Sequence, residues 1–359
     1  MAGEMRLDPK KRGPDAERLY QRLSQLVVGQ DEAIREIVDV YQLHGTGLNA
    51  PGRPIGNFLF LGPTGCGKTR LVEATAECLL GDPKAVIKID CAEFQHSHEI
   101  AKLVGSPPGY LGHRETHAML SQDSVDRYLT DTVRISFVLF DEIEKASDSL
   151  WNLLLGILDK ATLTLGDNKK TDFSRTMIFM TGNLGAAEMS AILQPHMGFQ
   201  ALPAPGLDAA GAVSEEVAGK MGRSATEAAR RKFTPEFLNR LDKIVVFKPL
   251  GTAELCRIVD LELNAIQDRI ANRAPERVFE FEVSARARDF LLAEGTDLRY
   301  GARHLKRTVD RLIVQPLANL IASRQVKQGD LITVDHEAGS DAMTFSRTIE
   351  RVIRRAEAA

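Results

Sequence analysis

The chain has 359 residues, enough for about two domains of ordinary size with buried cores. Hydrophobic residues make up 43% and charged residues 26%, a composition typical of a soluble globular protein. The net charge is only −3, so bulk charge excludes general polyanion binding and leaves only a local basic patch as a route to nucleic acid.

Cysteine spacing and hydropathy indicate a cytoplasmic protein. Cys66, Cys78, Cys91 and Cys256 have no paired spacing and no histidine at zinc-ligand spacing, so we interpret them as reduced thiols. Residues 1–13 are polar and lack the apolar core of a secretory signal. No run approaches the roughly 18 apolar residues that a membrane span needs, so we expect no membrane partner.

The first part of the chain is predicted to be an α/β domain. Residues 1–15 are charged and contain proline and glycine, which favours a flexible tail. Helical patterns follow over residues 16–26 and 31–48. Five short apolar runs come next, separated by helical or irregular sequence, which favours a parallel sheet between helices. These runs are Phe58–Leu61, Ala85–Ile89, Phe137–Phe140, Met177–Met180 and Ile244–Phe247.

The composition changes after the fourth apolar run. Residues 194–222 are rich in alanine, glycine and proline, which predicts a mobile insertion. Beyond Pro249 the pattern is mostly helical, over residues 252–273, 284–294 and 301–325, with the last helix kinked or broken at Pro316. A small strand is expected at 331–334. We therefore predict a tail (1–15), a large domain (16–248) and a smaller, mainly helical domain (249–359).

The first apolar run leads into a phosphate-binding motif. Residues 62–69 read Gly-Pro-Thr-Gly-Cys-Gly-Lys-Thr and satisfy G-x-x-x-x-G-K-[ST] between a predicted strand and helix. Such a loop surrounds phosphates with backbone N–H groups, and the helix adds its positive N-terminal end. Lys68 can reach the β- and γ-phosphates, and the Thr69 hydroxyl can ligate magnesium. We therefore predict ATP and magnesium as cofactors, with these nucleotide-binding residues: Gly62, Pro63, Thr64, Gly65, Cys66, Gly67, Lys68, Thr69 and Arg70.

Two adjacent acids follow the third apolar run. A strand that ends at Asp141 can place this carboxylate beside the magnesium, and Glu142 can orient and activate a water molecule. Helix capping is the alternative role for carboxylates after a buried strand. Acids in these two roles favour hydrolysis of ATP over phosphoryl transfer to a small acceptor.

The order of these motifs resembles that of the AAA+ superfamily, in the branch of the Clp unfoldases and disaggregases. The likeness runs from about Leu23 to about Gly329 and is strongest to the second ATPase module of ClpB, ClpC and ClpA, here as a stand-alone chain. Residues 62–69 correspond to Walker A, and residues 138–146, Val-Leu-Phe-Asp-Glu-Ile-Glu-Lys-Ala, correspond to Walker B.

The resemblance implies roles for four more residues. Val28, in Val-Gly-Gln, would contact adenine, and Asn183, in the sensor-1 segment 181–185, would polarise water near the γ-phosphate. Arg240, at the end of segment 234–240, would be an arginine finger, and Arg303, after Tyr-Gly-Ala, would be the sensor-2 arginine of the small domain. Surface salt bridges are the alternative for both arginines. A finger that acts in trans implies a ring, expected to be a homo-hexamer.

Residues 105–112 resemble the pore loop of Clp unfoldases, in which Tyr110 and Leu111 would grip a polypeptide. A surface turn with a packed tyrosine is the alternative. A second pore loop between residues 163 and 173 would place Lys169 and Lys170 in the channel, and a solvated charged loop fits there almost as well. Residues 113–134 depart from the family pattern, so their effect on the pore loop stays open.

The predicted function is an ATP-hydrolysing motor that remodels proteins by threading polypeptide substrates through the pore of a ring. A nucleic-acid motor or loader is one alternative, although the sequence has no helix-turn-helix, zinc module or dense basic stripe. An ATP-dependent assembly switch is the other. Met197-Gly198-Phe199 lies where ClpC and ClpA carry a loop for docking on a peptidase, and an ordinary loop is the competing interpretation.

Overall fold

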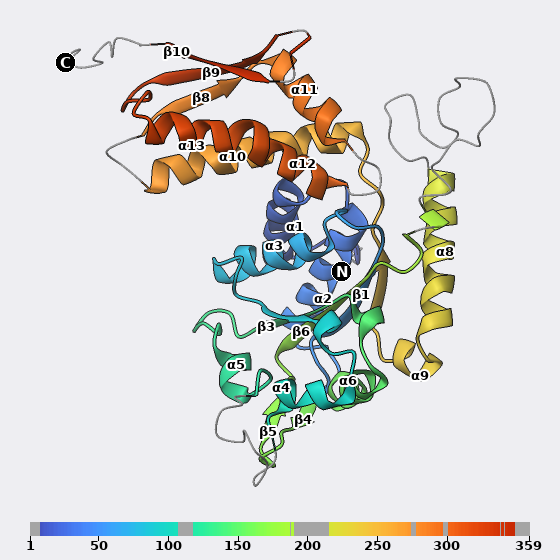
Figure 1. Cartoon of the computed structure of the whole chain (residues 1–359). Helices are drawn as coiled ribbons and strands as arrows, with labels where there is room; N and C mark the ends of the chain where they lie inside the picture. The colour runs from blue at the N-terminus through green and yellow to red at the C-terminus, as the bar shows by residue number, and fades with distance from the viewer. Residues whose placement is uncertain are drawn as a thin grey trace, which may run out of the picture. The chain divides into compact units, whose positions relative to one another are not determined.

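The computed structural model describes residues 8–106, 118–186, 188–189, 215–273, 278–296, 301–337, 339–340 and 342–348. The chain divides into two compact units (Figure 1). The first ends at Lys248, and the second consists mainly of the residues from Pro249 onward, with Thr64–Cys66 grouped with it. Within the described ranges, no helix is both long enough and apolar enough to cross a membrane.

The first unit is built on a five-stranded sheet in the order β2-β3-β6-β1-β7. Every neighbouring pair is parallel, so the predicted parallel α/β sheet is confirmed. The central strands are buried almost along their whole length, which explains why they read as continuous apolar runs. The strands are β1 (Gly56–Leu61), β2 (Ile87–Asp90), β3 (Ser136–Asp141), β6 (Thr176–Gly182) and β7 (Lys243–Val246).

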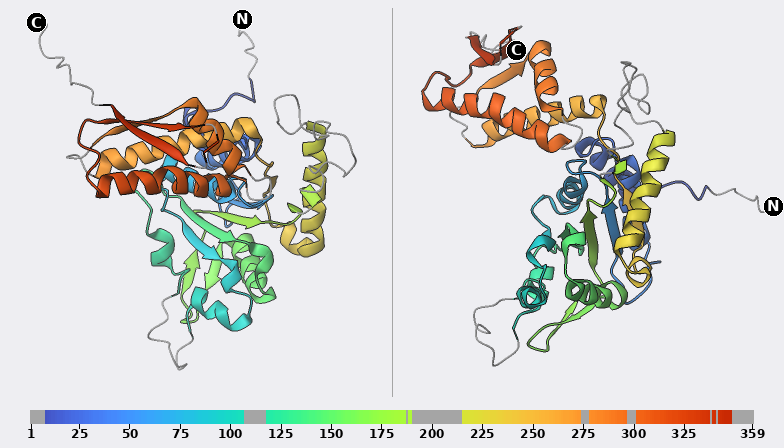
Figure 2. Two further views of the ribbon diagram at one scale, coloured as in Figure 1. Left: turned by 45° about the horizontal axis from the view of Figure 1, so that its top comes forward. Right: turned by 45° about the vertical axis from the view of Figure 1, so that its right-hand side comes forward.

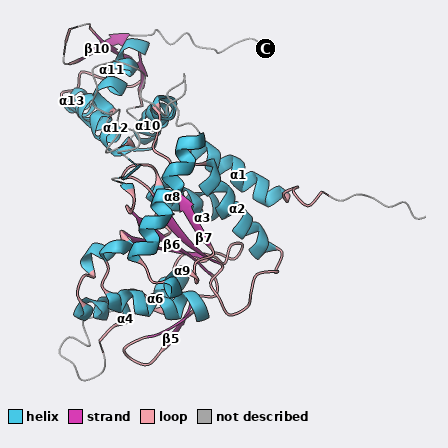
Figure 3. Ribbon diagram, turned by 90° about the vertical axis from the view of Figure 1, so that its right-hand side faces the viewer, coloured by secondary structure: helices cyan, strands magenta, loops and turns pink. Residues whose placement is uncertain are grey.

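Helices pack around these strands, as Figure 3 shows. In α2, buried Ile34, Ile37 and Val38 recur at the i, i+3, i+4 spacing of a helix with one apolar face. The α-helices of this unit are α1 (Pro14–Leu26), α2 (Asp31–Gly45), α3 (Lys68–Leu80), α4 (Ala101–Val104), α5 (Gln122–Asp126), α6 (Asp148–Lys160), α8 (Glu215–Lys232) and α9 (Pro235–Leu238). Short 3-10 turns cover η1 (Cys91–Glu93), η2 (Ser97–Ile100) and η3 (Ile143–Lys145).

The insertion predicted over residues 194–222 is wrong in its last part. Residues 215–222 form the start of α8, although Gly219 and Gly222 lower the helix propensity of this stretch. Buried residues at a spacing of four, Met221, Ala225 and Ala229, give the helix an apolar face. Packing of this face outweighs the low propensity. Residues 190–214, including Met197-Gly198-Phe199, lie outside the described residues.

The region predicted as a second pore loop forms an antiparallel hairpin of β4 (Thr162–Thr164) and β5 (Lys170–Asp172). Lys169 lies in its turn with 80% of its side chain exposed and pairs with Asp167 at 3.0 Å. Lys170 is also exposed. The lysines therefore face solvent in the single chain, as both interpretations of this loop require.

The second unit combines helices with a three-stranded sheet in the order β10-β9-β8 (Figure 2). Strands β8 and β9 are parallel, and β9 and β10 are antiparallel. Only β9 was predicted, because β8 and β10 are short and contain no continuous apolar run. The elements are α10 (Thr252–Arg273), β8 (Glu280–Val283), α11 (Ala285–Gly295), α12 (Ala302–Val309), α13 (Gln315–Ala322), β9 (Leu331–His336) and β10 (Met343–Thr348).

Pro316 does not break the helix in which it lies. The chain continues from α12 through a π-helical turn, η5 (Asp310–Val314), into α13, with Pro316 in the first turn of α13. Proline removes one backbone donor and its ring needs space beside the preceding turn. The wider π-helical turn directly before it offers that space, so the predicted kink is replaced by a local change of helix type.

Candidate active site

The loop between β1 and α3 forms the centre of the candidate site. Gly62, Gly65 and Gly67 have φ angles of +143°, +78° and +103°, which L-residues with side chains rarely adopt. A Cβ on Gly62 would lie 2.7 Å from the Phe247 carbonyl oxygen, so the loop approaches the end of β7 at backbone distance. Helix α3 begins at Lys68, and its N-terminal N–H groups and dipole favour a phosphate here.

Lys68 is the most enclosed charged group of the site, with 8% of the residue exposed. Its Nζ donates to the carbonyl oxygens of Gly62 at 2.6 Å and Pro63 at 2.9 Å. It also donates to Asn183 Oδ1 at 2.9 Å. These acceptors compensate for the burial of the ammonium group and fix it at the mouth of the glycine loop.

Thr69 and Arg70 follow in the first turn of α3, both half-buried. The Arg70 guanidinium pairs with Glu77 on its own helix at 3.2 Å. In this structure Arg70 therefore contacts its own helix, and its nucleotide contact stays a prediction. Thr69 follows Lys68 directly, the position that its predicted role requires.

The acidic pair lies at the end of β3, held by the neighbouring strand β6. The Thr181 hydroxyl donates to Asp141 Oδ1 and accepts the backbone N–H of Glu142 at 3.1 Å. Glu142 has a φ of +56°, a left-handed conformation that is unfavourable for a residue with a side chain. One buried hydroxyl thus orders both acids and stabilises a strained backbone.

Asn183 connects the two halves of the site. Its Oδ1 accepts from Lys68 as described, and its Nδ2 donates to Glu142 Oε1 at 3.4 Å. The other oxygen of Glu142 pairs with Lys145 Nζ at 2.5 Å. This hydrogen bond and the negative charge of Glu142 raise the pKa of Lys145. The structure therefore brings three predicted residues, Lys68, Asn183 and Glu142, into one hydrogen-bonded chain.

The side chains at this end of the sheet suit magnesium bound together with phosphate. Asp141 and Thr69 offer a carboxylate and a hydroxyl oxygen, which are donor types that magnesium prefers. In the part of the chain that the structure describes, no group of three or more His, Cys, Asp or Glu residues could hold a metal ion. A magnesium ion that takes its remaining ligands from phosphate and water fits this sparse donor set.

Arg240 lies at the opposite end of the sheet. Its carbonyl oxygen accepts from Asn57 Nδ2 at 3.1 Å, and Asn57 is the second residue of β1. Strand β1 rises about 3.3 Å per residue, so this point is roughly 16 Å from the glycine loop at the other end. The guanidinium is held by Glu236 at 3.1 Å and lies 3.9 Å from Asp159. An arginine side chain cannot span that separation to a nucleotide on its own loop.

For Val28 and Arg303, the structure gives burial and position. Val28 is 5% exposed and directly precedes Gly29, whose φ is +74°. Arg303 is exposed in the first turn of α12, in the second unit. Tyr110 and Leu111 lie outside the described residues.

The base of the predicted pore loop is described, and it packs on the β4–β5 hairpin. The Gly166 N–H donates to the Val104 carbonyl oxygen at 2.8 Å. A Cβ on Gly166 would lie 2.5 Å from the Gly105 carbonyl oxygen. The two segments predicted as pore loops are therefore joined backbone to backbone where the first one begins.

No role was predicted for Thr181, Glu144 or Lys145, although each lies inside the Walker B or the sensor-1 segment. Their position within Walker B and sensor 1 was the only indication in the sequence, and the structure shows what they contact.

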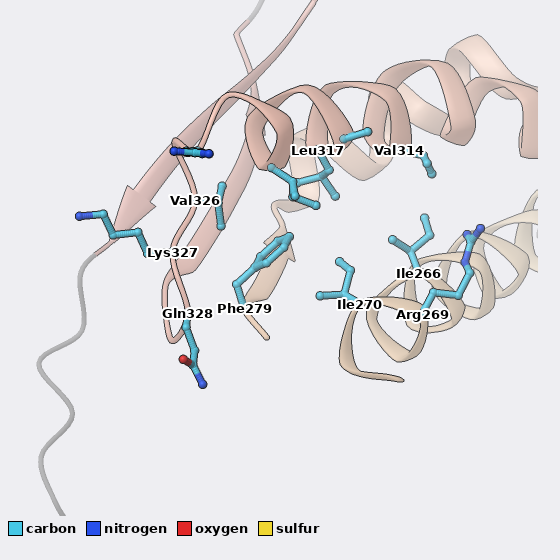
Figure 4. A pocket seen from close by; sticks show the side chains of 12 residues that line it. Ile266, Arg269, Ile270, Phe279, Val314, Leu317, Val326, Lys327 and Gln328 are labelled. Carbon is cyan, nitrogen blue, oxygen red and sulfur yellow. The ribbon is translucent and has the colours of Figure 1, made fainter. Parts of the chain in front are cut away.

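A separate cavity of about 590 Å³ lies within the second unit and contains none of the candidate residues. Figure 4 shows the apolar side chains that line it, among them Ile270, Phe279 and Leu317.

A glycine loop with a buried lysine, an Asp-Glu pair on a nearby strand and an asparagine between them define the P-loop site of an AAA protein. The chain belongs to the AAA domain (Cdc48 subfamily) family, which residues 53–244 match. Residues 250–334 match the C-terminal, D2-small domain of ClpB protein.

The most similar relatives agree with the Clp branch predicted from the motifs. The chain is 40% identical over 332 residues to the chaperone protein ClpB of Rhodopseudomonas palustris, covering 92% of this chain and 34% of that protein. It is 39% identical over 331 residues to ClpB of Meiothermus ruber, covering 91% of this chain and 35% of that protein. The chain thus spans about a third of the length of these relatives.

A solved structure shows the same fold. It is a closed-state cryo-EM reconstruction of Hsp104 with ATPγS and FITC casein. The TM-score is 0.75 at 29% sequence identity, and the match covers 93% of this chain and 52% of that chain. The predicted fold class, a P-loop α/β domain followed by a mainly helical small domain, is confirmed.

Proposed function

We propose that this chain is the ATPase subunit of a protein-remodelling motor that hydrolyses ATP to ADP and phosphate and threads polypeptides through the pore of a ring. The observation that carries the proposal is the hydrogen-bonded chain from Lys68 through Asn183 to Glu142. It joins a phosphate-binding cation, a polar amide and a carboxylate. These three groups are needed for a water molecule to attack a γ-phosphate.

Each residue has a defined task in this reaction. Backbone N–H groups of residues 62–68 and the α3 N-terminus bind the phosphates, and Lys68 neutralises their charge. Glu142 orients the attacking water and accepts its proton, and the Asn183 amide holds this water between Glu142 and the γ-phosphate. Magnesium, when bound beside Asp141 and Thr69, supplies charge stabilisation on the phosphate oxygens.

The position of Arg240 supports an assembly of several subunits. Since Arg240 is about one strand length from the glycine loop of its own chain, its predicted role as a finger is open only to the ATP of a neighbouring subunit. A contact that repeats head to tail closes into a ring when the rotation permits. We propose a homo-hexamer, as the Clp resemblance implies.

The packing of Gly105 on Gly166 supports threading of a polypeptide. It places the start of the loop with Tyr110 and Leu111 beside the hairpin with Lys169 and Lys170. Apolar contact made by an aromatic and an aliphatic side chain does not depend on the sequence of the polypeptide that is held. The cryo-EM relative was determined with FITC casein, a protein, which agrees with a polypeptide as substrate.

The alternative functions, a nucleic-acid motor and an assembly switch, receive less support. The relatives compared above are ClpB proteins and Hsp104, and none of these matches favours a nucleic-acid motor. A switch without turnover would not need the Lys68–Asn183–Glu142 arrangement. We do not propose a peptidase partner, since residues 197–199 lie outside the described residues and no comparison supports one.

Substitution of Tyr110 by alanine tests the threading proposal. We expect Tyr110→Ala to lose unfolding of a tagged, folded substrate protein while basal ATP hydrolysis stays within about twofold of wild type, because the loop holds the substrate and not the nucleotide. The assay follows substrate fluorescence and phosphate release in parallel. Tyr128→Ala, which removes a tyrosine elsewhere in the same region, is the matched control. Unfolding that survives Tyr110→Ala would show that this loop does not grip the substrate.

A further inference from the structure

Glu144 is a third acid beside the site, and no predicted role uses it. It lies in η3, two positions beyond Glu142, and is half-buried. Its Oε1 accepts the backbone N–H of Asn183 at 2.9 Å. Its Oε2 is buried and has no hydrogen-bond partner among the described residues. The side chain is therefore aimed at the backbone of Asn183.

The end of β6 is shaped to admit this carboxylate. Gly182 is the last residue of β6 and directly precedes Asn183. A Cβ on Gly182 would lie 3.2 Å from Glu144 Oε2, closer than ordinary packing allows. A larger residue at position 182 would require this oxygen to shift by a few tenths of an ångström.

Stability of the fold does not explain a carboxylate at this place. A buried carboxylate oxygen without a hydrogen-bond partner raises the free energy of the folded state. Two more acids, Asp141 and Glu142, lie within three positions, so a negative charge here is opposed by like charges. A role in ordering the site accounts for both features.

We propose that Glu144 is a positioning residue for ATP hydrolysis, which holds the backbone of Asn183 so that its side chain spans Lys68 and Glu142. Strand β6 ends at Gly182, so Asn183 lies beyond the ladder that orders the strand. The Glu144 hydrogen bond replaces the missing ladder contact. Thr181 holds the backbone of Glu142 in a corresponding way, and together the two contacts set the distance between the Asn183 amide and the Glu142 carboxylate.

This inference rests on the proposed roles of Asn183 and Glu142, so its test includes Asn183 itself. Four variants of the full chain are compared with wild type: Glu144→Ala, Glu144→Gln, Asn183→Ala and the double variant Glu144→Ala/Asn183→Ala. For each, kcat and KM for ATP, affinity for a fluorescent ADP analogue and the thermal unfolding midpoint are measured. Glu93→Ala, which removes an acid with 64% of its side chain exposed, is the matched control.

We expect Glu144→Ala to lower kcat about 10- to 100-fold, because an amide displaced by about 1 Å loses this much rate. ADP affinity should change less than about threefold, since the phosphate loop is untouched. Glu144→Gln keeps an oxygen acceptor and should stay within about threefold of wild type in kcat. The double variant should be no slower than Asn183→Ala, since Glu144 acts through Asn183.

The outcomes separate this inference from the proposed function. Wild-type kcat in Glu144→Ala, or additive losses in the double variant, would overturn the role of Glu144 while a slow Asn183→Ala leaves the role of Asn183 in place. Wild-type kcat in Asn183→Ala would overturn both. Should Glu144→Ala fail to fold, Glu144→Asp decides, because it keeps the charge but withdraws the carboxylate from the Asn183 N–H by one methylene group. A reduced kcat with unchanged ADP affinity supports the inference, and an unchanged kcat overturns it.

Discussion

Thr181 is 1% exposed, and its hydroxyl serves two neighbours at once. It accepts the Glu142 N–H and donates to Asp141, so a residue with almost no exposed surface sets the direction of both acids. The strained φ of Glu142 is tolerated because this contact and the Lys145 pair hold it from two sides. At the scale of single residues, the site thus depends on side chains that support the reacting groups as much as on those groups themselves.

Replacement of Thr181 by valine tests this support. Thr181→Val keeps the shape but leaves the Asp141 oxygen and the Glu142 N–H without their partner. We expect kcat to fall about 10-fold through misplacement of the acids and the free energy of unfolding to fall by about 1–3 kcal/mol. Steady-state ATP hydrolysis and urea denaturation measure the two effects. Thr181→Ser retains the hydroxyl and should stay near wild type; equal kcat in Thr181→Val and wild type would contradict the role.

At the scale of elements, the junction between α11 and β9 stabilises the second unit by capping. Ser284 precedes α11, and its hydroxyl accepts the Ala287 N–H at 3.1 Å and donates to Asp335 in β9. The hydrogen bonds from Ser284 and the His336 N–H, and then Arg286, lower the pKa of Asp335. The cap therefore joins the start of a helix to a strand that is distant in sequence.

Removal of this cap has an effect that depends on pH. Ser284→Ala should lower the free energy of unfolding at pH 7 by about 1 kcal/mol, since an N-cap is lost. Asp335 has a lowered pKa, so its contribution is present above its ordinary pKa and is lost as the pH falls through the folded-state value. The difference between wild type and Ser284→Ala should therefore shrink on acidification. Urea denaturation at pH 7 and pH 3 measures it, with Ser340→Ala as control, and a difference that grows in acid would be contrary to this assignment.

At the scale of the whole molecule, Arg240 and the glycine loop occupy opposite ends of one sheet. Strand β1 separates them by its full length, so a single chain cannot bring both to one nucleotide. Under the proposed role of Arg240 as an arginine finger, the ATPase site is complete only where two subunits meet, and assembly and hydrolysis become coupled.

Mixing of two inactive variants tests this arrangement. Arg240→Ala and Glu142→Gln subunits should each hydrolyse ATP at least about 100-fold more slowly than wild type. In an equal mixture, about a quarter of the interfaces combine an intact Glu142 with a neighbour's intact Arg240, so ATPase activity should return towards a quarter of the wild-type value. Phosphate release measures this recovery. A mixture of Lys68→Ala with Glu142→Gln should not recover, because every site then lacks either its own Lys68 or its own Glu142. No recovery in the first mixture would show that Arg240 does not act in trans.

Local pattern was sufficient for much of this protein. The five parallel strands were predicted from short apolar runs, which in the three central strands reflect burial on both faces. The nucleotide loop and the acidic pair were predicted because their residue types and spacing follow from phosphate chemistry. Strands β8 and β10 and the start of α8 were missed, because packing rather than local propensity decides short or glycine-containing elements.

Strand order and everything that depends on it came from tertiary structure. Strand β6 lies between β1 and β3, which is why Asn183 reaches both Lys68 and Glu142, why Thr181 can order the acids and why Glu144 can hold the backbone of Asn183. Pairing between strands that are distant in the sequence, such as Gly56 with Met177 and Ser136 with Thr176, leaves no local trace in it. The reason is that the hydrogen bonds of a strand are the same with any neighbour. The sequence alone therefore determined which groups we propose to act on ATP, and the fold decided how they are held together and that Arg240 is held apart.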